Sequence, residues 1–179
     1  FESGGGEAIG YAVNVPLLAG AGDRELIRAF EEVVVPLFES YEPDFLVTQL
    51  GVDGHYLDPL AHLCYTSRGY EDVLRRLRDL AHDNCSDGWL AVGGGGYNVV
   101  NVARLWTLFL AIMLDSDVPR EFPEQFMEHI KGIDLEGCPL TFRNERELAQ
   151  MFNTREAIEQ DFERVLQRIR EQVFLAHGM

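Results

Sequence analysis

One repeated order of segments constrains the fold of this chain most: a short apolar run, then a polar or glycine-rich loop, then an amphipathic segment. The apolar runs are FLVTQL (45–50) and WLAV (89–92), and the loops after them are residues 51–66 and 93–98. Short apolar strands that alternate with helices are typical of βαβ units, in which the strands lie parallel in one sheet. The sequence therefore predicts an α/β fold with a parallel β-sheet flanked by helices.

Helices are expected where apolar residues recur three or four positions apart, because that spacing places them on one side of a helix. The expected helices cover residues 26–38, 70–80, 99–114 and 121–131, and a last one begins near Asn153. Asp23 is expected to cap the first helix, and Pro36 to kink its last turn. Residues 9–15 are expected to form a further short strand that ends at Pro16.

The last helix carries a continuous apolar stripe, formed by Ile158, Phe162, Val165, Leu166, Ile169 and Val173. Such a stripe favours a helix that packs on the edge of the domain, and a dimer face is the alternative.

Charge and cysteine content restrict the partners and the compartment. The net charge is −15, from 15 basic and 30 acidic residues, and this argues against binding to nucleic acid or to an anionic membrane. No apolar run reaches the roughly 18–20 residues of a transmembrane helix. Cys64, Cys85 and Cys138 are far apart, which is typical of reduced thiols rather than of a disulfide framework. The sequence therefore predicts a cytoplasmic protein without a nucleic-acid or membrane partner.

The glycine run Gly93–Gly96 and the following Tyr97 form the first candidate site. The dinucleotide pattern G-x-G-x-x-G fails, because its sixth position is Asn98 or Val99, and no Lys-Ser/Thr pair follows to make a P-loop. What remains is a backbone that a ligand can approach closely, with a phenol that can donate a hydrogen bond to an oxyanion. A tight turn with a packed tyrosine is the alternative.

A second candidate site follows the first strand, where Asp53, His55 and Asp58 lie in one loop. An Asp at the end of a strand is a good ligand for a divalent ion, and the spacing of Asp53 and His55 places both on one side of an extended loop. A solvated turn rich in Asp is the alternative. In parallel sheets, sites form beyond the carboxyl ends of the strands, and both loops lie in that position.

Three segments, in this order and spacing, resemble the zinc-dependent histone deacetylase family. They are YAVNVPL, FEEVVVPLFESYEPDFLVTQLGVDGHYLDPL and GGGGYNVVNVARLW, and they lie within residues 8–118. The closer likeness is to the microbial acetoin-utilisation (AcuC-type) branch. The resemblance implies an arginase/deacetylase-like fold, with residues 1–179 as the C-terminal part of a single deacetylase domain. Residues 8–118 would form its core βα units and residues 119–179 a C-terminal helical extension.

The resemblance also implies roles for five residues. Asp53 matches one of the two Asp that, with one His, hold the family's zinc ion, and Tyr97 matches the tyrosine that donates a hydrogen bond to the acyl carbonyl in the transition state. Gly95 and Gly96 match the wall of the acyl-lysine tunnel, and Leu60 matches an apolar residue at its rim. The family's pattern does not make His55 a ligand, so we leave it out of the metal set. These matches imply zinc-dependent hydrolysis of N-acetyl-lysine amides on proteins.

The remaining zinc ligands and the general-base histidine of the family lie in its N-terminal half, and no second Asp-x-His and no His-His occurs here. Asp53 alone cannot hold zinc, because three protein ligands are usual at catalytic zinc sites. The chain is therefore expected to be a fragment that is inactive alone. The implied cofactor is Zn²⁺, with K⁺ left open because its main sites also lie upstream in the family.

Two other functions stay open. One is a non-catalytic binding or scaffold protein with a deacetylase-like fold, and the other is an acetylpolyamine amidohydrolase of the same superfamily. Complex-forming eukaryotic members carry arginines that bind an inositol phosphate, whereas Pro59 and Val100 stand at the matching positions here. The substitution argues against that kind of corepressor partner.

Overall fold

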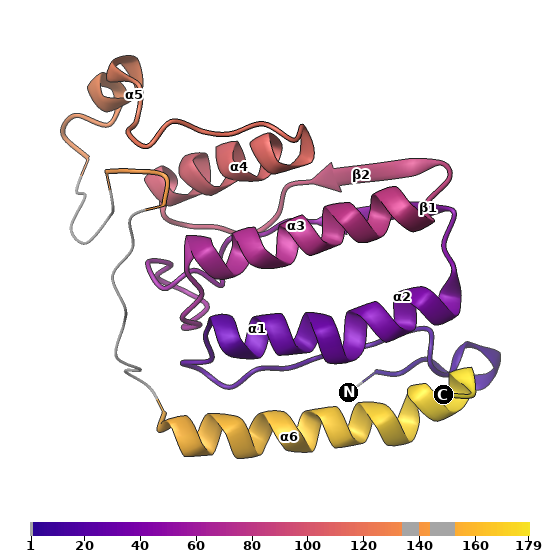
Figure 1. The fold of residues 1–179 in the computed structure, drawn as a ribbon. Helices are drawn as coiled ribbons and strands as arrows, with labels where there is room; N and C mark the ends of the chain where they lie inside the picture. Colours follow the sequence, from indigo (N-terminus) through magenta and orange to yellow (C-terminus); the bar gives the residue numbers. More distant parts are fainter. Residues whose placement is uncertain (1, 134–139, 144–152) are drawn as a thin grey trace.

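A computed structural model describes residues 2–133, 140–143 and 153–179 of the chain (Figure 1). Its elements in chain order are η1 (Gly6–Ala8), α1 (Asp23–Ala29), η2 (Phe30–Val34), α2 (Val35–Tyr41), β1 (Phe45–Gln49), α3 (Ser67–Asn84), β2 (Gly88–Val92), α4 (Val99–Met113), α5 (Glu124–His129), α6 (Arg155–Gln172) and η3 (Phe174–His177). None of the helices within the described residues is long and apolar enough to cross a bilayer.

The two predicted strands form a parallel pair, and the fold class is confirmed. β1 pairs with β2 from Phe45–Gly88 to Gln49–Val92, and α3 is the crossover helix between them (Figure 1). The backbone N–H of Leu50 extends the pairing by donating to the carbonyl of Val92 (2.9 Å). Because the strands are parallel, loops 51–66 and 93–98 leave the sheet at the same edge.

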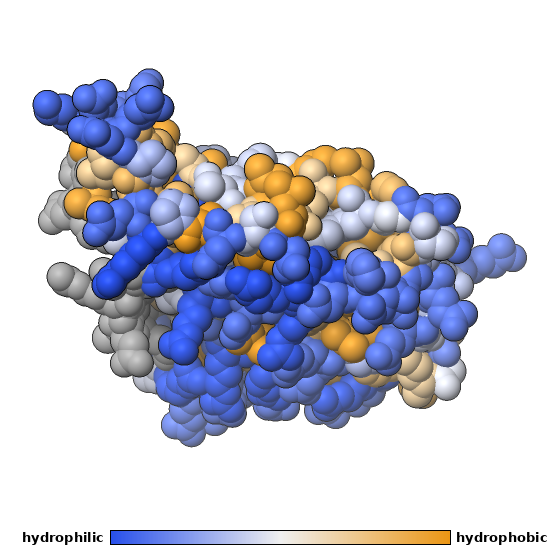
Figure 2. Space-filling view, turned by 45° about the horizontal axis from the view of Figure 1, so that its top comes forward, coloured by the Kyte–Doolittle hydropathy of each residue, from blue (hydrophilic) through white to orange (hydrophobic). Residues whose placement is uncertain are grey.

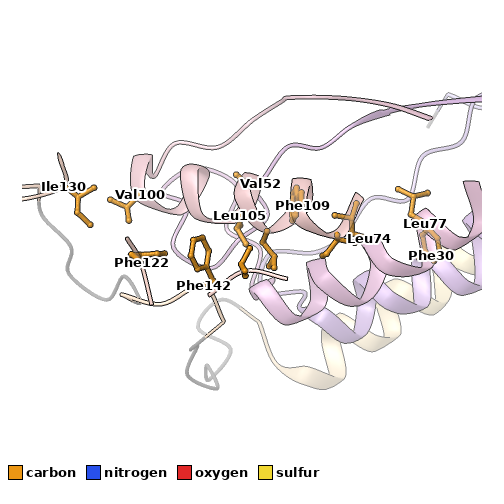
Figure 3. Close-up of a cluster of buried hydrophobic side chains, with 13 residues drawn as sticks. Phe30, Val52, Leu74, Leu77, Val100, Leu105, Phe109, Phe122, Ile130 and Phe142 are labelled. Atoms are coloured by element: carbon orange, nitrogen blue, oxygen red, sulfur yellow. The ribbon is translucent and has the colours of Figure 1, made fainter. Parts of the chain in front are cut away.

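The helices are stacked in layers beside this sheet. Figure 1 shows α6, then the helical segment from α1 to α2, then α3, with α4 and the strands beyond α3. One buried cluster joins α3, α4 and the inner face of the sheet, and includes Leu74, Leu105, Leu108 and Ile112 (Figure 3). The predicted stripe of α6 forms a second cluster around Val33, so this helix packs on the edge of the fold as expected.

Asp23 differs from its expected role as a helix cap. Gly22 is the N-cap of α1, and the Asp23 carboxylate instead accepts hydrogen bonds from the backbone N–H (2.7 Å) and the hydroxyl (2.6 Å) of Thr66. Thr66 is the N-cap of α3, where its side chain accepts from the N–H groups of Arg68 and Gly69. Asp23 thus ties the start of α1 to the start of α3, at the end of loop 51–66.

Replacing Thr66 by Ala is expected to lower the free energy of unfolding by about 1–2 kcal/mol, because the N-cap acceptor of α3 is lost. Urea denaturation followed by circular dichroism measures the change. Thr66→Ser keeps the hydroxyl and is the matched control, with a much smaller loss. Equal stability of the Ala and Ser variants would contradict a capping role.

The helix predicted over residues 26–38 is continuous, but it contains a π-helical turn. In η2 the N–H of Val35 donates to the carbonyl of Phe30, five residues back, instead of four. Pro36, in the first turn of α2, has no N–H to donate, and its ring clashes with a carbonyl four residues earlier in a regular α-helix. The wider π turn accommodates Pro36 without ending the helix.

Two expectations about secondary structure are wrong. Residues 9–15 form no strand, because they pair with neither β1 nor β2. The helix expected over residues 121–131 is limited to α5.

The last helix begins at Arg155, close to Asn153 as predicted. Its N-cap is Thr154, whose side chain accepts from the N–H of Ala157, whereas Asn153 donates its amide to the carbonyl of Ala19 (2.8 Å).

The outer face of the two-stranded sheet is apolar and exposed. It presents Phe45, Val47, Leu90 and Val92, each between 45% and 59% exposed. In Figure 2 apolar side chains gather on the side of the molecule that carries α4 and the strands, above a largely hydrophilic lower part. The described residues therefore leave one face of the sheet uncovered.

Cys64 and Cys85 are free thiols, as expected, and burial raises the pKa of both. Cys138 lies outside the described residues.

Candidate functional site

The two loops at the carboxyl edge of the sheet are bonded to each other through the backbone. The N–H of Val52 donates to the carbonyl of Gly95 at 2.6 Å, three residues beyond the last strand pair. This bond holds the segment after β1 against the glycine run after β2. The candidate residues of the two loops are therefore neighbours in space, as their positions at parallel strand ends predicted.

Asp53 lies in the first turn after β1, half-buried against the glycine run. A Cβ on Gly95 would lie 2.1 Å from Oδ2 of Asp53, so the carboxylate occupies the space that the missing side chain leaves. The phenol of Tyr70 lies behind the same loop, where a Cβ on Gly54 would be 2.9 Å from its oxygen. Burial, together with the nearby Tyr65, Asp53 and Asp58, raises the pKa of Tyr70, so this phenol stays protonated.

Close packing at every position explains the run of four glycines. A Cβ at residues 93–96 would come within 1.7–2.6 Å of a neighbouring side chain: Trp106, Gln49, Asp53 and Val52 in turn. Gly96 alone of the four has a φ in the left-handed region, +148°. The run therefore allows the backbone after β2 to pass directly along the loop that carries Asp53.

Tyr97 follows this run, directly before the N-cap of α4, and it is 56% exposed. Its backbone N–H donates to Oδ2 of Asp58 at 2.8 Å. Within the part of the chain that the structure describes, its phenol oxygen has no hydrogen-bond partner. The tyrosine is therefore accessible to a ligand, and the alternative of a packed tyrosine is wrong.

Asp58 is buried (8% exposed), and both of its carboxylate oxygens are engaged. Oδ2 accepts from Tyr97, and Oδ1 accepts from the N–H of Leu60 at 2.9 Å. Leu60 is itself 60% exposed. One carboxylate thus brings together the backbones of two predicted site residues.

His55 is fully buried and contacts a cation, not a metal position. Its Nε2 lies 2.9 Å from Nη2 of Arg104, a residue of α4 that is 1% exposed. A guanidinium has only donors, so Nε2 is the acceptor in this contact. This geometry agrees with leaving His55 out of the metal set.

Arg104 also donates to Oδ1 of Asn101 (2.7 Å) and to the carbonyl of Phe142 (3.3 Å). Arg104 lies in the apolar segment 99–114, and the sequence pattern did not predict a role for it. A signal was present, because Asn101 and Arg104 are three residues apart and so lie on one side of a helix whose inward positions are otherwise apolar. The pair marks the side of α4 that holds loop 51–60.

The five predicted site residues thus lie along one edge, and their roles stay predictions. Asp53 lies beside Gly95, Gly96 contacts Val52, and Leu60 and Tyr97 share Asp58. Among the described residues, no group of three or more His, Cys, Asp or Glu side chains could hold a metal ion. Asp53 fits one oxygen ligand of a divalent ion, and these residues alone do not complete a metal site.

Comparisons with known proteins agree with the resemblance seen in the sequence. The family model described as "Histone deacetylase domain" matches residues 1–113. The chain is 37% identical over 126 residues to "Acetoin utilization protein AcuC" of Bacillus subtilis (strain 168), which covers 68% of this chain and 33% of that protein.

Two further relatives extend the comparison. A "Probable deacetylase" of Archaeoglobus fulgidus is 37% identical over 98 residues, covering 55% of this chain and 27% of that protein. "Probable histone deacetylase 1-B" of Xenopus laevis is 31% identical over 171 residues, covering 94% of this chain and 33% of that protein. The chain spans about a third of the length of the curated relatives it matches. Since the family model covers more than half of its residues, the chain belongs to the histone deacetylase domain family.

Proposed function

We propose that the protein containing this chain is a zinc-dependent deacetylase that hydrolyses N-acetyl-lysine amides on proteins. The observation that carries the proposal is the edge where Asp53 lies against the glycine run and Tyr97 is exposed directly after it. A partly buried carboxylate beside a glycine run that leads into an exposed tyrosine is a suitable arrangement for amide hydrolysis, which needs a polarised carbonyl and a donor for the developing oxyanion.

In this proposal Asp53 supplies one oxygen ligand to the zinc ion. The other ligands come from outside the described residues, because catalytic zinc sites normally have three protein ligands. Zinc, when bound, acts as a Lewis acid on the acyl carbonyl. Because Gly95 has no side chain, the Asp53 carboxylate can lie directly against its backbone. No side chain at position 95 then competes with the ion for that space.

The residues of this chain act mainly on the substrate. The phenol of Tyr97 donates a hydrogen bond to the carbonyl oxygen as negative charge develops there. The backbone of Gly95 and Gly96 forms one wall of the acyl-lysine tunnel. Leu60, exposed at the neighbouring loop, contacts the methylene groups of the lysine at the rim.

The test is made on the complete protein that contains this chain. Its intact mass and zinc content are measured first, and acetate release is then followed with an acetyl-lysine peptide and with an acetylated polyamine. We expect about one zinc per chain and preference for the peptide. Preference for the polyamine would reassign the substrate class.

A non-catalytic binding protein is the second candidate function, because the described residues supply only one of the ligands that a zinc site needs. Absence of both zinc and acetate release would favour this function and contradict the deacetylase proposal.

Replacing Gly95 by Ala is expected to weaken zinc binding by about 10- to 100-fold, as disturbing the support of a metal ligand usually does. The new Cβ would lie 2.1 Å from Asp53 Oδ2 and displace the carboxylate. Competition with a chelator measures the affinity. Gly5→Ala is the matched control, because no atom lies within 4 Å of its added Cβ. Unchanged zinc affinity in Gly95→Ala would contradict the place of Asp53 in the site.

A further inference from the structure

Besides the backbone bond from Val52 to Gly95, two side-chain contacts among the described residues attach loop 51–60 to α4 and to the segment before it. At one point the side chain of Arg104 contacts the buried ring of His55 (2.9 Å). At the other, the side chain of Asp58 accepts from the backbone of Tyr97 (2.8 Å). The loop itself is tight between these points, because the N–H of Asp58 donates to the carbonyl of His55 at 2.8 Å. The backbone of Asp58 is therefore held by the loop itself, independently of the contact between its side chain and Tyr97.

We propose that Asp58 is a positioning residue, whose carboxylate fixes the backbone of Tyr97 so that its phenol points at the substrate carbonyl. This inference rests on the proposed function and deepens it. Both Asp58 oxygens already accept hydrogen bonds from the backbone N–H groups of Tyr97 and Leu60, so its role is assigned to holding the backbone rather than to the reaction itself. It acts through Tyr97.

The exposure of Tyr97 makes such an anchor necessary. The side chain is 56% exposed, and no described residue holds its phenol by a hydrogen bond. The position of the oxygen therefore depends on where the backbone of residue 97 is held. A displacement of about 1 Å in a catalytic group can cost about 100-fold in rate.

The same carboxylate links the catalytic group to the tunnel rim. Because Oδ1 accepts from the N–H of Leu60 and Oδ2 accepts from the N–H of Tyr97, one rigid planar group sets the separation of the two backbones. A lysine side chain that contacts the rim at Leu60 would then present its acetyl group at a fixed depth. Asp58 thereby couples substrate placement to the hydrogen bond from Tyr97.

The test is Asp58→Asn in the complete protein. The amide has nearly the same shape but only one accepting oxygen, so Tyr97 or Leu60 loses its acceptor. We expect kcat to fall by about 10- to 100-fold, with KM changed by less than about 3-fold and zinc content unchanged. Asp23→Asn is the matched control, because that carboxylate also accepts hydrogen bonds at both of its oxygens, but from Thr66 at the start of α3 instead of from Tyr97 and Leu60. It is expected to keep the wild-type kcat.

A double-variant cycle separates positioning from general destabilisation. If Asp58 acts through the phenol, Asp58→Asn should lower kcat little further in a Tyr97→Phe background. Additive losses, or a wild-type kcat in Asp58→Asn alone, would overturn the proposal.

Amide hydrogen exchange gives a readout that does not need activity. The Tyr97 amide should exchange at least about 10-fold faster in Asp58→Asn than in wild type or Asp23→Asn, because a lost hydrogen bond exposes it to solvent. Equal exchange in all three proteins would overturn the positioning role. Absence of acetate release from the wild-type protein would instead count against the proposed function, and the exchange result would still decide whether Asp58 holds Tyr97.

Discussion

Replacing Tyr97 by Phe in the complete protein is expected to lower kcat for deacetylation by about 100- to 1,000-fold, or about 2.7–4 kcal/mol in the barrier. The ring stays and only the hydroxyl is lost, so the effect isolates the hydrogen bond to the developing oxyanion. KM should change little, because this bond is stronger in the transition state than in the bound substrate.

Steady-state kinetics with an acetyl-lysine peptide measures both constants. Tyr41→Phe is the matched control, since Tyr41 is similarly exposed (61%) but lies at the end of α2, in a different part of the chain from the loops of the site. It should behave as wild type. Full activity in Tyr97→Phe would remove Tyr97 from the mechanism and leave the deacetylase proposal without its oxyanion donor.

The parts of the fold that the sequence predicts well depend on local patterns. The apolar runs 45–50 and 89–92 each have a turn signal after them and a helix beyond, and both form strands in parallel register. The strand expected at 9–15 fails because a strand needs a partner, and nothing local in its sequence shows whether one is available.

The contacts of polar side chains depend on partners distant in the sequence, and that is why they were missed. Asp23 satisfies a capping pattern, yet its partner is Thr66, 43 residues away. His55 has the spacing of a metal ligand, yet its Nε2 contacts Arg104, which is 49 residues away in the sequence. The glycine run was predicted to let a ligand approach the backbone closely, and that role stays a prediction. What approaches it, however, includes Asp53 from the other loop.

Replacing Arg104 by Met is expected to destabilise the protein strongly, although Met fills much of the same space. The guanidinium is 1% exposed and donates to His55 Nε2 and Asn101 Oδ1. Met donates nothing, so these two buried side-chain acceptors lose this partner, as does the carbonyl of Phe142. A buried polar group without a partner costs about 1–3 kcal/mol, so the free energy of unfolding should fall by about 2–6 kcal/mol.

Urea denaturation measures this loss, and two comparisons identify its cause. Arg164→Met removes an exposed arginine of α6 that pairs with Asp161 at 3.1 Å, and it should cost less than about 1 kcal/mol. Adding His55→Leu to Arg104→Met removes one of the two side-chain acceptors that lost their donor and should recover part of the stability, because an apolar pair needs no donor. If Arg104→Met costs no more than Arg164→Met, the buried contact does not hold loop 51–60 on α4. The alignment of Asp53 with Tyr97 would then depend on the backbone bonds of Val52 and Tyr97 alone.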